Sequence, residues 1–126
     1  MVTIQLGASD ASLRLSANGG TWCEVSLVTG SEIIFLGGDS LAKVRDGFLR
    51  FVGKEFGQTP AGEIEGVPVT WVMSLMEGHT SLYAADTAGG RALFIQSADG
   101  VTIAKLVLDG GQSRVWQESL AELATV

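Results

Sequence analysis

The sequence predicts an α+β protein in which a group of antiparallel strands is followed by a helix, twice over. In two regions, short segments of alternating apolar residues are separated by turn signals rich in glycine. After each region, apolar residues recur with the 3.6-residue period of a helix. The length of 126 residues is close to that of one ordinary domain, so we expect a single domain over 1–126.

The first group of strands is expected within residues 2–36. Its segments are divided by turn signals such as Asn18-Gly19-Gly20 and Thr29-Gly30. The pattern predicts strands at 2–6, 12–16, 21–28 and 32–36.

A helix is expected from about residue 40 to 56, with Asp39 or Ser40 as its N-cap and Gly57 just after its end. The apolar side of this helix is formed by Leu41, Val44, Phe48, Phe51 and Val52, and the opposite side by Lys43, Arg50 and Lys54. The segment 57–66 that follows is expected to be a loop.

The second group of strands, 67–108, has the clearest signals. Apolar residues occupy every second position from Val67 to Leu75, which predicts a strand with five apolar side chains on one face. Gly78-His79 and Asp99-Gly100 each fit a two-residue hairpin turn. Tight turns join antiparallel neighbours, because parallel strands need a long crossover, so the group is predicted to be an antiparallel meander.

A second helix is expected over about 113–124. Trp116, Leu120 and Leu123 form its inward side, and Glu118 and Glu122 its outward side. Both helices are expected to pack on one face of a sheet. The junctions before them are alike in their paired glycines and serine, so the chain is either a pseudo-repeat of four strands and a helix, or has two junctions built by the same local physics.

Composition limits the function classes. The formal net charge of −6, from 8 basic and 14 acidic residues, disfavours binding to nucleic acids and anionic membranes. The chain has no apolar run long enough to cross a bilayer and no pattern of a signal peptide, so a soluble, cytoplasmic protein is expected. The single cysteine, Cys23, lies in an apolar run and is expected to be a buried, inert thiol.

One segment has a catalytic appearance. The run from Ile33 to Leu41, with Gly38-Asp39-Ser40-Leu41 after an apolar strand, resembles the first signature block of the GDSL family of ester hydrolases. The resemblance implies a parallel fold and Ser40 as nucleophile. The Asp-x-x-His block of that family is absent, since the only histidine, His79, follows Met76 at that spacing. An unassisted serine is a poor nucleophile, so we expect no catalytic residues, and Asp39 and Ser40 are explained as helix-capping residues.

Other chemistry-bearing residues do not form a recognisable site. His79 lies in an expected hairpin turn and is interpreted as a solvated side chain. The carboxylates lack the spacing of metal ligands, and the paired glycines before each helix lack a phosphate-binding motif. We therefore expect neither a metal nor a cofactor.

Two features suggest a ligand or partner surface. The basic stripe Lys43, Arg50 and Lys54 is either a solvated helix face or a contact for an acidic partner, including a second subunit. The strand from Val67 is also apolar on its second face, where Val72 and Met76 lie. That face is expected to close into a barrel, to pack against a second subunit, or to hold a small apolar ligand.

The order of strands and helices is similar to that of the Whirly family of single-stranded nucleic-acid-binding proteins. This resemblance implies that the chain binds single-stranded nucleic acid on the same architecture. The lysine-rich strand motif of that family is absent. We therefore expect a non-catalytic binding or protein-interaction module, in a homodimer, that uses its sheet surface or a pocket between sheet and helix. A single-stranded nucleic-acid binder is the alternative, and an ester hydrolase using Ser40 is a third hypothesis.

Overall fold

The computed structural model describes residues 2–8, 11–53 and 61–123. Within them the order of elements confirms the predicted α+β class, with strands, a helix, strands and a helix. The elements are β1 (Val2–Gly7), β2 (Ser12–Asn18), β3 (Trp22–Thr29), β4 (Glu32–Ser40), α1 (Leu41–Gly53), β5 (Gly62–Ile64), β6 (Val67–Ser74), β7 (Ser81–Thr87), β8 (Gly90–Gln96), β9 (Thr102–Leu108) and α2 (Gly110–Leu123).

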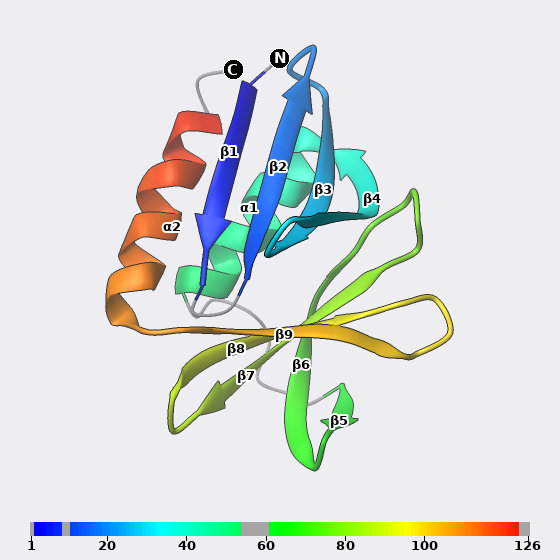
Figure 1. Cartoon of the computed structure of the whole chain (residues 1–126), viewed down its shortest axis with the longest axis vertical. Helices are drawn as coiled ribbons and strands as arrows, with labels where there is room; N and C mark the ends of the chain where they lie inside the picture. Colours follow the sequence, from blue (N-terminus) through cyan, green and yellow to red (C-terminus); the bar gives the residue numbers. More distant parts are fainter. Residues whose placement is uncertain (1, 9–10, 54–60, 124–126) are drawn as a thin grey trace.

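The strands form two antiparallel sheets, β1-β2-β3-β4 and β5-β6-β7-β8-β9, and within each sheet the strands lie in chain order. Short turns allow this arrangement, because an antiparallel neighbour needs only a hairpin connection. The two sheets run in clearly different directions, and both helices lie along the first sheet (Figure 1). The predicted meander and the helices packed on a sheet are therefore confirmed.

The segment expected to be a loop contains a strand. Within its described part, β5 pairs with β6, and Ile64 lies opposite Val67. The turn between them places Glu65 and Gly66 at φ of 54° and 78°. Positive φ at both central residues is the geometry of a tight hairpin, but a glutamate is rarely found in it, so the sequence signal was weak. The predicted end of the first helix, at about residue 56 and just before Gly57, lies outside the described residues.

The second helix begins earlier than expected, at Gly110. Asp109 caps it, because Asp109 Oδ1 accepts a hydrogen bond from the backbone N–H of Gln112 at 2.8 Å, and Gln112 Oε1 accepts one from the N–H of Asp109 at 3.0 Å. This reciprocal pair is a capping box with glutamine at its third helical position. The cap outweighs the poor helix propensity of the two glycines that follow.

The prediction of five apolar side chains on one face of β6 is wrong. The pairing of β6 with β7 shifts register between Trp71 and Met73, which is the mark of a β-bulge. Val69 packs on one side of the sheet, Met73 on the other, and Trp71 is 48% exposed. An inserted residue changes which face the later side chains take, and alternation in the sequence alone cannot reveal it.

The main core lies between the two sheets and the two helices. It includes the inner faces of both sheets and the predicted apolar sides of both helices. Trp116 of α2 is fully buried in it, with ring centroids 5.8 Å from Phe48 and 5.9 Å from Phe51 of α1. Its indole Nε1–H donates to the carbonyl oxygen of Gly7 at 2.6 Å, which ties α2 to the end of β1.

A smaller apolar cluster occupies the outer face of the second sheet. It consists of Ile64, Val69, Ala85, Ala92 and Phe94, with Val67, Tyr83 and Val107 packed against it. These strands are apolar on both faces partly because Ile64, brought by the β5–β6 hairpin, packs on the apolar side chains of the outer face.

Candidate functional site

The segment that resembles an ester-hydrolase motif is a structural joint. Asp39 Oδ2 accepts hydrogen bonds from Lys43 Nζ at 2.6 Å and from the backbone N–H of Met76 at 2.9 Å. Lys43 Nζ also donates to the carbonyl oxygen of Ser74 at 2.8 Å. We call Asp39 and Lys43, with these two backbone partners, the Asp39 clip. It joins β4 and α1 to the end of β6.

Backbone contacts beside the clip complete the joint. Gly38 and Glu77 exchange two backbone hydrogen bonds, of 3.1 and 2.9 Å, and the hydroxyl of Thr80 donates to the carbonyl oxygen of Leu36. A side chain at Gly37, whose φ is 150°, would overlap the carbonyl oxygen of Glu77. Gly37 therefore lets the β6–β7 connection approach β4 closely, whereas a side chain at Gly38 would overlap the ring of Trp22.

Electrostatics at the clip favour the ionised carboxylate. Burial of Asp39 alone would raise its pKa. The hydrogen bond from Lys43 and those from the backbone N–H groups of Ser40 and Met76 outweigh burial and hold the pKa of Asp39 below its usual value. The ionised carboxylate of Asp39 therefore helps to hold β4 and α1 against the end of β6.

Ser40 acts as a helix cap. Its Oγ accepts a hydrogen bond from the backbone N–H of Lys43 at 3.3 Å, which satisfies one of the free donors in the first turn of α1. His79 lies in an exposed turn with φ of 52°, and no hydrogen bond between it and Ser40 is present. The antiparallel sheet also differs from the parallel fold that the hydrolase resemblance implies.

We expect the variant Ser40→Ala to be about 1 kcal/mol less stable than the wild type, because it loses this cap. Urea unfolding measures the difference, with Ser113→Ala in the first turn of α2 as a matched control. Any hydrolysis of a short-chain ester should be the same in the wild type and Ser40→Ala. Activity that disappears in the variant would restore Ser40 as a nucleophile.

The other predicted surface residues do not come together as one site. Lys43 is held in the Asp39 clip, Arg50 is exposed on α1, and Lys54 lies outside the described residues. Val72 is only 2% exposed and belongs to the main core, so it contributes to no surface. Met76 is 62% exposed, beside the clip that its own backbone helps to form.

A different surface is conspicuously apolar. Three successive residues of β4, which we call the β4 stripe, are exposed by 54% (Ile33), 39% (Ile34) and 49% (Phe35). Because β4 is the edge strand of the first sheet, these residues have β3 on one side. Among the described residues, the opposite edge of 32–35 has no backbone partner, and pairing there starts only at Gly38.

Sequence reasoning missed the β4 stripe. An uninterrupted apolar run such as this one is typical of a buried strand, so nothing local marks it as exposed. The stripe is exposed because β4 is the last strand of the first sheet and the second sheet does not pack on it. The usable signal is the absence of Lys and Pro, the residues that commonly protect an edge strand from a partner.

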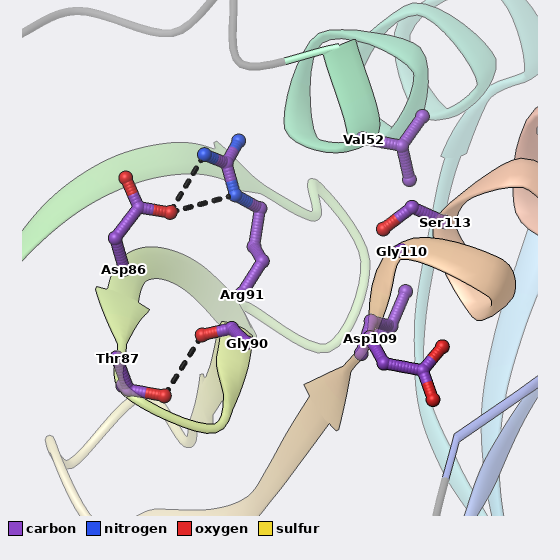
Figure 2. Close-up of a pocket in the computed structure, with 9 residues that line it drawn as sticks. Val52, Asp86, Thr87, Gly90, Arg91, Asp109, Gly110 and Ser113 are labelled. Carbon is purple, nitrogen blue, oxygen red and sulfur yellow. Dashed lines mark hydrogen bonds and ion pairs between the residues drawn. The ribbon is translucent and has the colours of Figure 1, made fainter.

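A pocket of about 410 Å³ lies beside the start of α2. Figure 2 shows Arg91 and Asp86 on one side and Val52, Gly110 and Ser113 on the other. The Arg91 side chain, 5% exposed, donates from Nε and Nη2 to Asp86 Oδ1 at 3.1 and 2.7 Å. It also donates from Nη1 to the carbonyl oxygen of Phe51 at 2.7 Å. The buried cation therefore holds the end of α1 against β7, and these bonds explain it without a ligand.

The outer face of the second sheet carries an aromatic row. Trp71, Tyr83, Phe94 and Lys105 lie directly opposite one another on successive strands. Directly opposite residues share a face, and Lys105 Nζ is 5.4 Å from the centre of the Phe94 ring. Phe94 is buried, so Trp71 offers most of the exposed ring surface. A small pocket of about 140 Å³ lies nearby, lined by residues 61–64 and by Val69, Tyr83 and Gln96.

Metal and thiol chemistry find no support in the described residues. Among the described residues, no group of three or more histidine, cysteine, aspartate or glutamate side chains is placed to hold a metal ion. Burial raises the pKa of Cys23 to about 11, so its thiol is protonated and unreactive at neutral pH. Neither of the two described helices has the length and apolar character needed to cross a membrane.

The β4 stripe thus combines neighbouring exposed apolar side chains with an open strand edge. Comparisons with models of known protein families and with curated proteins find no match to this chain.

Proposed function

We propose that the chain is a non-catalytic protein-interaction module and that it binds its partner along the β4 stripe. The observation that carries this proposal is the coincidence of three large exposed side chains with an open strand edge. Exposed apolar residues that lie singly are ordinary, but neighbouring ones at an edge are typical of interaction surfaces.

Strand addition is the binding mode that this geometry supports. An extended segment can donate and accept backbone hydrogen bonds along an open edge, and its side chains contact those of the edge strand. Ile33 and Phe35 lie on one face of β4 and Ile34 on the other, since side chains alternate along a strand. An added strand would therefore bury apolar surface on both faces.

The homodimer expected from the sequence is one form of this interaction. Two β4 edges paired antiparallel about Ile34 would set Ile33 opposite Phe35 of the second copy. Light scattering tests this form directly. A dimer that becomes a monomer when the stripe is changed would assign the edge to a second copy of the chain.

We expect the double variant Ile33→Ser/Phe35→Ser to lose binding of partner peptides by more than about tenfold, because burying each large side chain contributes about 1.5–3 kcal/mol. Peptides would be selected from a random library on the immobilised wild type, and their affinities measured for both proteins by fluorescence anisotropy. Substitutions at exposed positions change stability little, and circular dichroism checks that the double variant keeps its fold.

The matched control is Val101→Ser, since Val101 is 61% exposed and stands directly before β9 of the second sheet. It should bind the selected peptides as the wild type does. If the library yields no binders, or if its binders recognise the double variant equally well, the β4 stripe is not an interaction surface.

A single-stranded nucleic-acid binder is the second candidate, and the aromatic row on the outer face of the second sheet favours it. Bases stack on exposed aromatic side chains, and Trp71 is 48% exposed. Lys105 is the only basic residue in the row. Binding to single-stranded DNA that weakens steeply with salt and is reduced in Trp71→Ala would support this candidate, and no binding at low salt would exclude it.

A further inference from the structure

We infer that the partner of the β4 stripe is an extended segment with a short apolar centre and a lysine or arginine at each end. This inference rests on the proposed function of the stripe and adds the chemistry of the partner. It follows from the charges at the two ends of the open edge and from the length of edge between them.

Acidic side chains mark both ends of the open edge. Glu32, at the start of β4, is exposed, and so is Glu77, whose backbone pairs with Gly38. The segment from Glu32 to Gly38 rises by about 20 Å, at roughly 3.3 Å per residue. Neither β4 nor Glu77 and its immediate neighbours include a lysine or an arginine.

The backbone pair between Gly38 and Glu77 limits the length of an added strand. Gly38 already exchanges two hydrogen bonds with Glu77. The carbonyl oxygen of Leu36 accepts a hydrogen bond from Thr80, so a partner can pair only with the part of β4 before Leu36. An incoming segment would therefore place a few residues against Ile33, Ile34 and Phe35, and then leave the edge. Its flanking residues would come close to Glu32 and Glu77, where positive charges are favoured.

Nearby basic residues do not cancel this acidic character. The charge of Lys43 is paired with Asp39 at 2.6 Å. Arg14 lies opposite Ser26, which in turn lies opposite Phe35, so Arg14 is two strands away from the edge. A second copy of the chain would bring a net charge of −6 and the same acidic ends. Charge complementarity therefore favours a basic segment over a second copy.

The test uses two dye-labelled peptides with the same centre of alternating isoleucine and threonine. One has two lysines at each end and the other two glutamates. Fluorescence anisotropy at low and at physiological salt measures their affinities for the full chain and for three variants. These are the charge reversal Glu32→Lys/Glu77→Lys, the stripe variant Ile33→Ser/Phe35→Ser, and the control Glu118→Lys on the exposed side of α2.

We expect the wild type to bind the lysine-flanked peptide about threefold to tenfold more tightly than the glutamate-flanked one, with a smaller ratio at higher salt. The charge reversal should invert this preference, and Glu118→Lys should retain it. The stripe variant should bind neither peptide well, because the apolar contacts are lost.

Three other results would overturn the inference in distinguishable ways. If both peptides bind equally and binding still needs Ile33 and Phe35, the stripe is an interaction surface but its partner is not chosen by charge. If neither peptide binds, or if the stripe variant binds as the wild type does, the proposed function itself is wrong. A wild-type dimer that excludes the peptides would assign the edge to a second copy.

Discussion

Replacing Trp116 with alanine is expected to lower the free energy of unfolding by about 4 kcal/mol. Trp116 is fully buried, and its ring packs against Phe48 and Phe51, so truncation would leave a large cavity between α1 and α2. It would also leave the carbonyl oxygen of Gly7 without the indole donor. Urea unfolding followed by circular dichroism measures this loss.

A comparison with Trp116→Phe separates the two contributions. Phenylalanine retains most of the ring packing but cannot donate to the carbonyl oxygen of Gly7, so its cost should be smaller, at about 2 kcal/mol. Val115→Ala is the control on the same helix, because Val115 is 52% exposed. A loss of less than about 1 kcal/mol in Trp116→Ala would show that α2 is not an essential part of the core.

The variant Asp39→Asn is expected to be about 2 kcal/mol less stable than the wild type at neutral pH. An amide has nearly the shape of the carboxylate but lacks the charge that holds Lys43 at 2.6 Å. Lys43 is itself 42% exposed, so solvent can rehydrate its ammonium group, and the cost stays below that of a fully buried pair. Chemical unfolding at neutral pH measures this difference.

The same pair of proteins should differ in pH dependence. The folded-state pKa of Asp39 is lowered, so the unfolded state binds a proton at higher pH than the folded state does. The stabilisation from this carboxylate is therefore fully present above the unfolded pKa of about 4, and it is lost as pH falls through the folded-state value.

The stability gap between wild type and Asp39→Asn should accordingly narrow as the pH is lowered below about 4. Asp46→Asn serves as the control, because Asp46 is exposed on α1 and lies outside the clip. A gap that stays constant from neutral to acid pH would mean that the charge of Asp39 does not hold the joint together.

Much of the fold follows from local patterns in the sequence. A turn is found where Asp99-Gly100 predicted one, between β8 and β9, and Gly100 has the positive φ of 79° that it needs. The N–H of Ser97 donates to the carbonyl oxygen of Val101, so the loop is longer than the predicted two-residue turn. Phe48 and Trp116 lie on the predicted inner sides of their helices, because a helix buries residues three or four positions apart. Short turns and helical periodicity involve few neighbours in the chain, so they can be read without the tertiary structure.

The candidate site could not be predicted in this way. Asp39 and Ser40 resembled a catalytic motif, and their capping role was predicted, but the contact of Asp39 with the N–H of Met76 joins residues far apart in the sequence. Val72 was expected on a surface, and a bulge in β6 placed it in the core. Both results depend on how distant segments pair.

The sequence by itself determined the class of the fold, the alternation of strand groups with helices and the apolar sides of the two helices, although it missed β5. The tertiary structure decided which strand stands at an edge. Ile33, Ile34 and Phe35 have the apolar pattern of a buried strand, yet no element within the described ranges covers them, because strand pairing in the first sheet ends at β4. Exposure is a property of the neighbours that a strand acquires, and a single sequence does not state which neighbours those are.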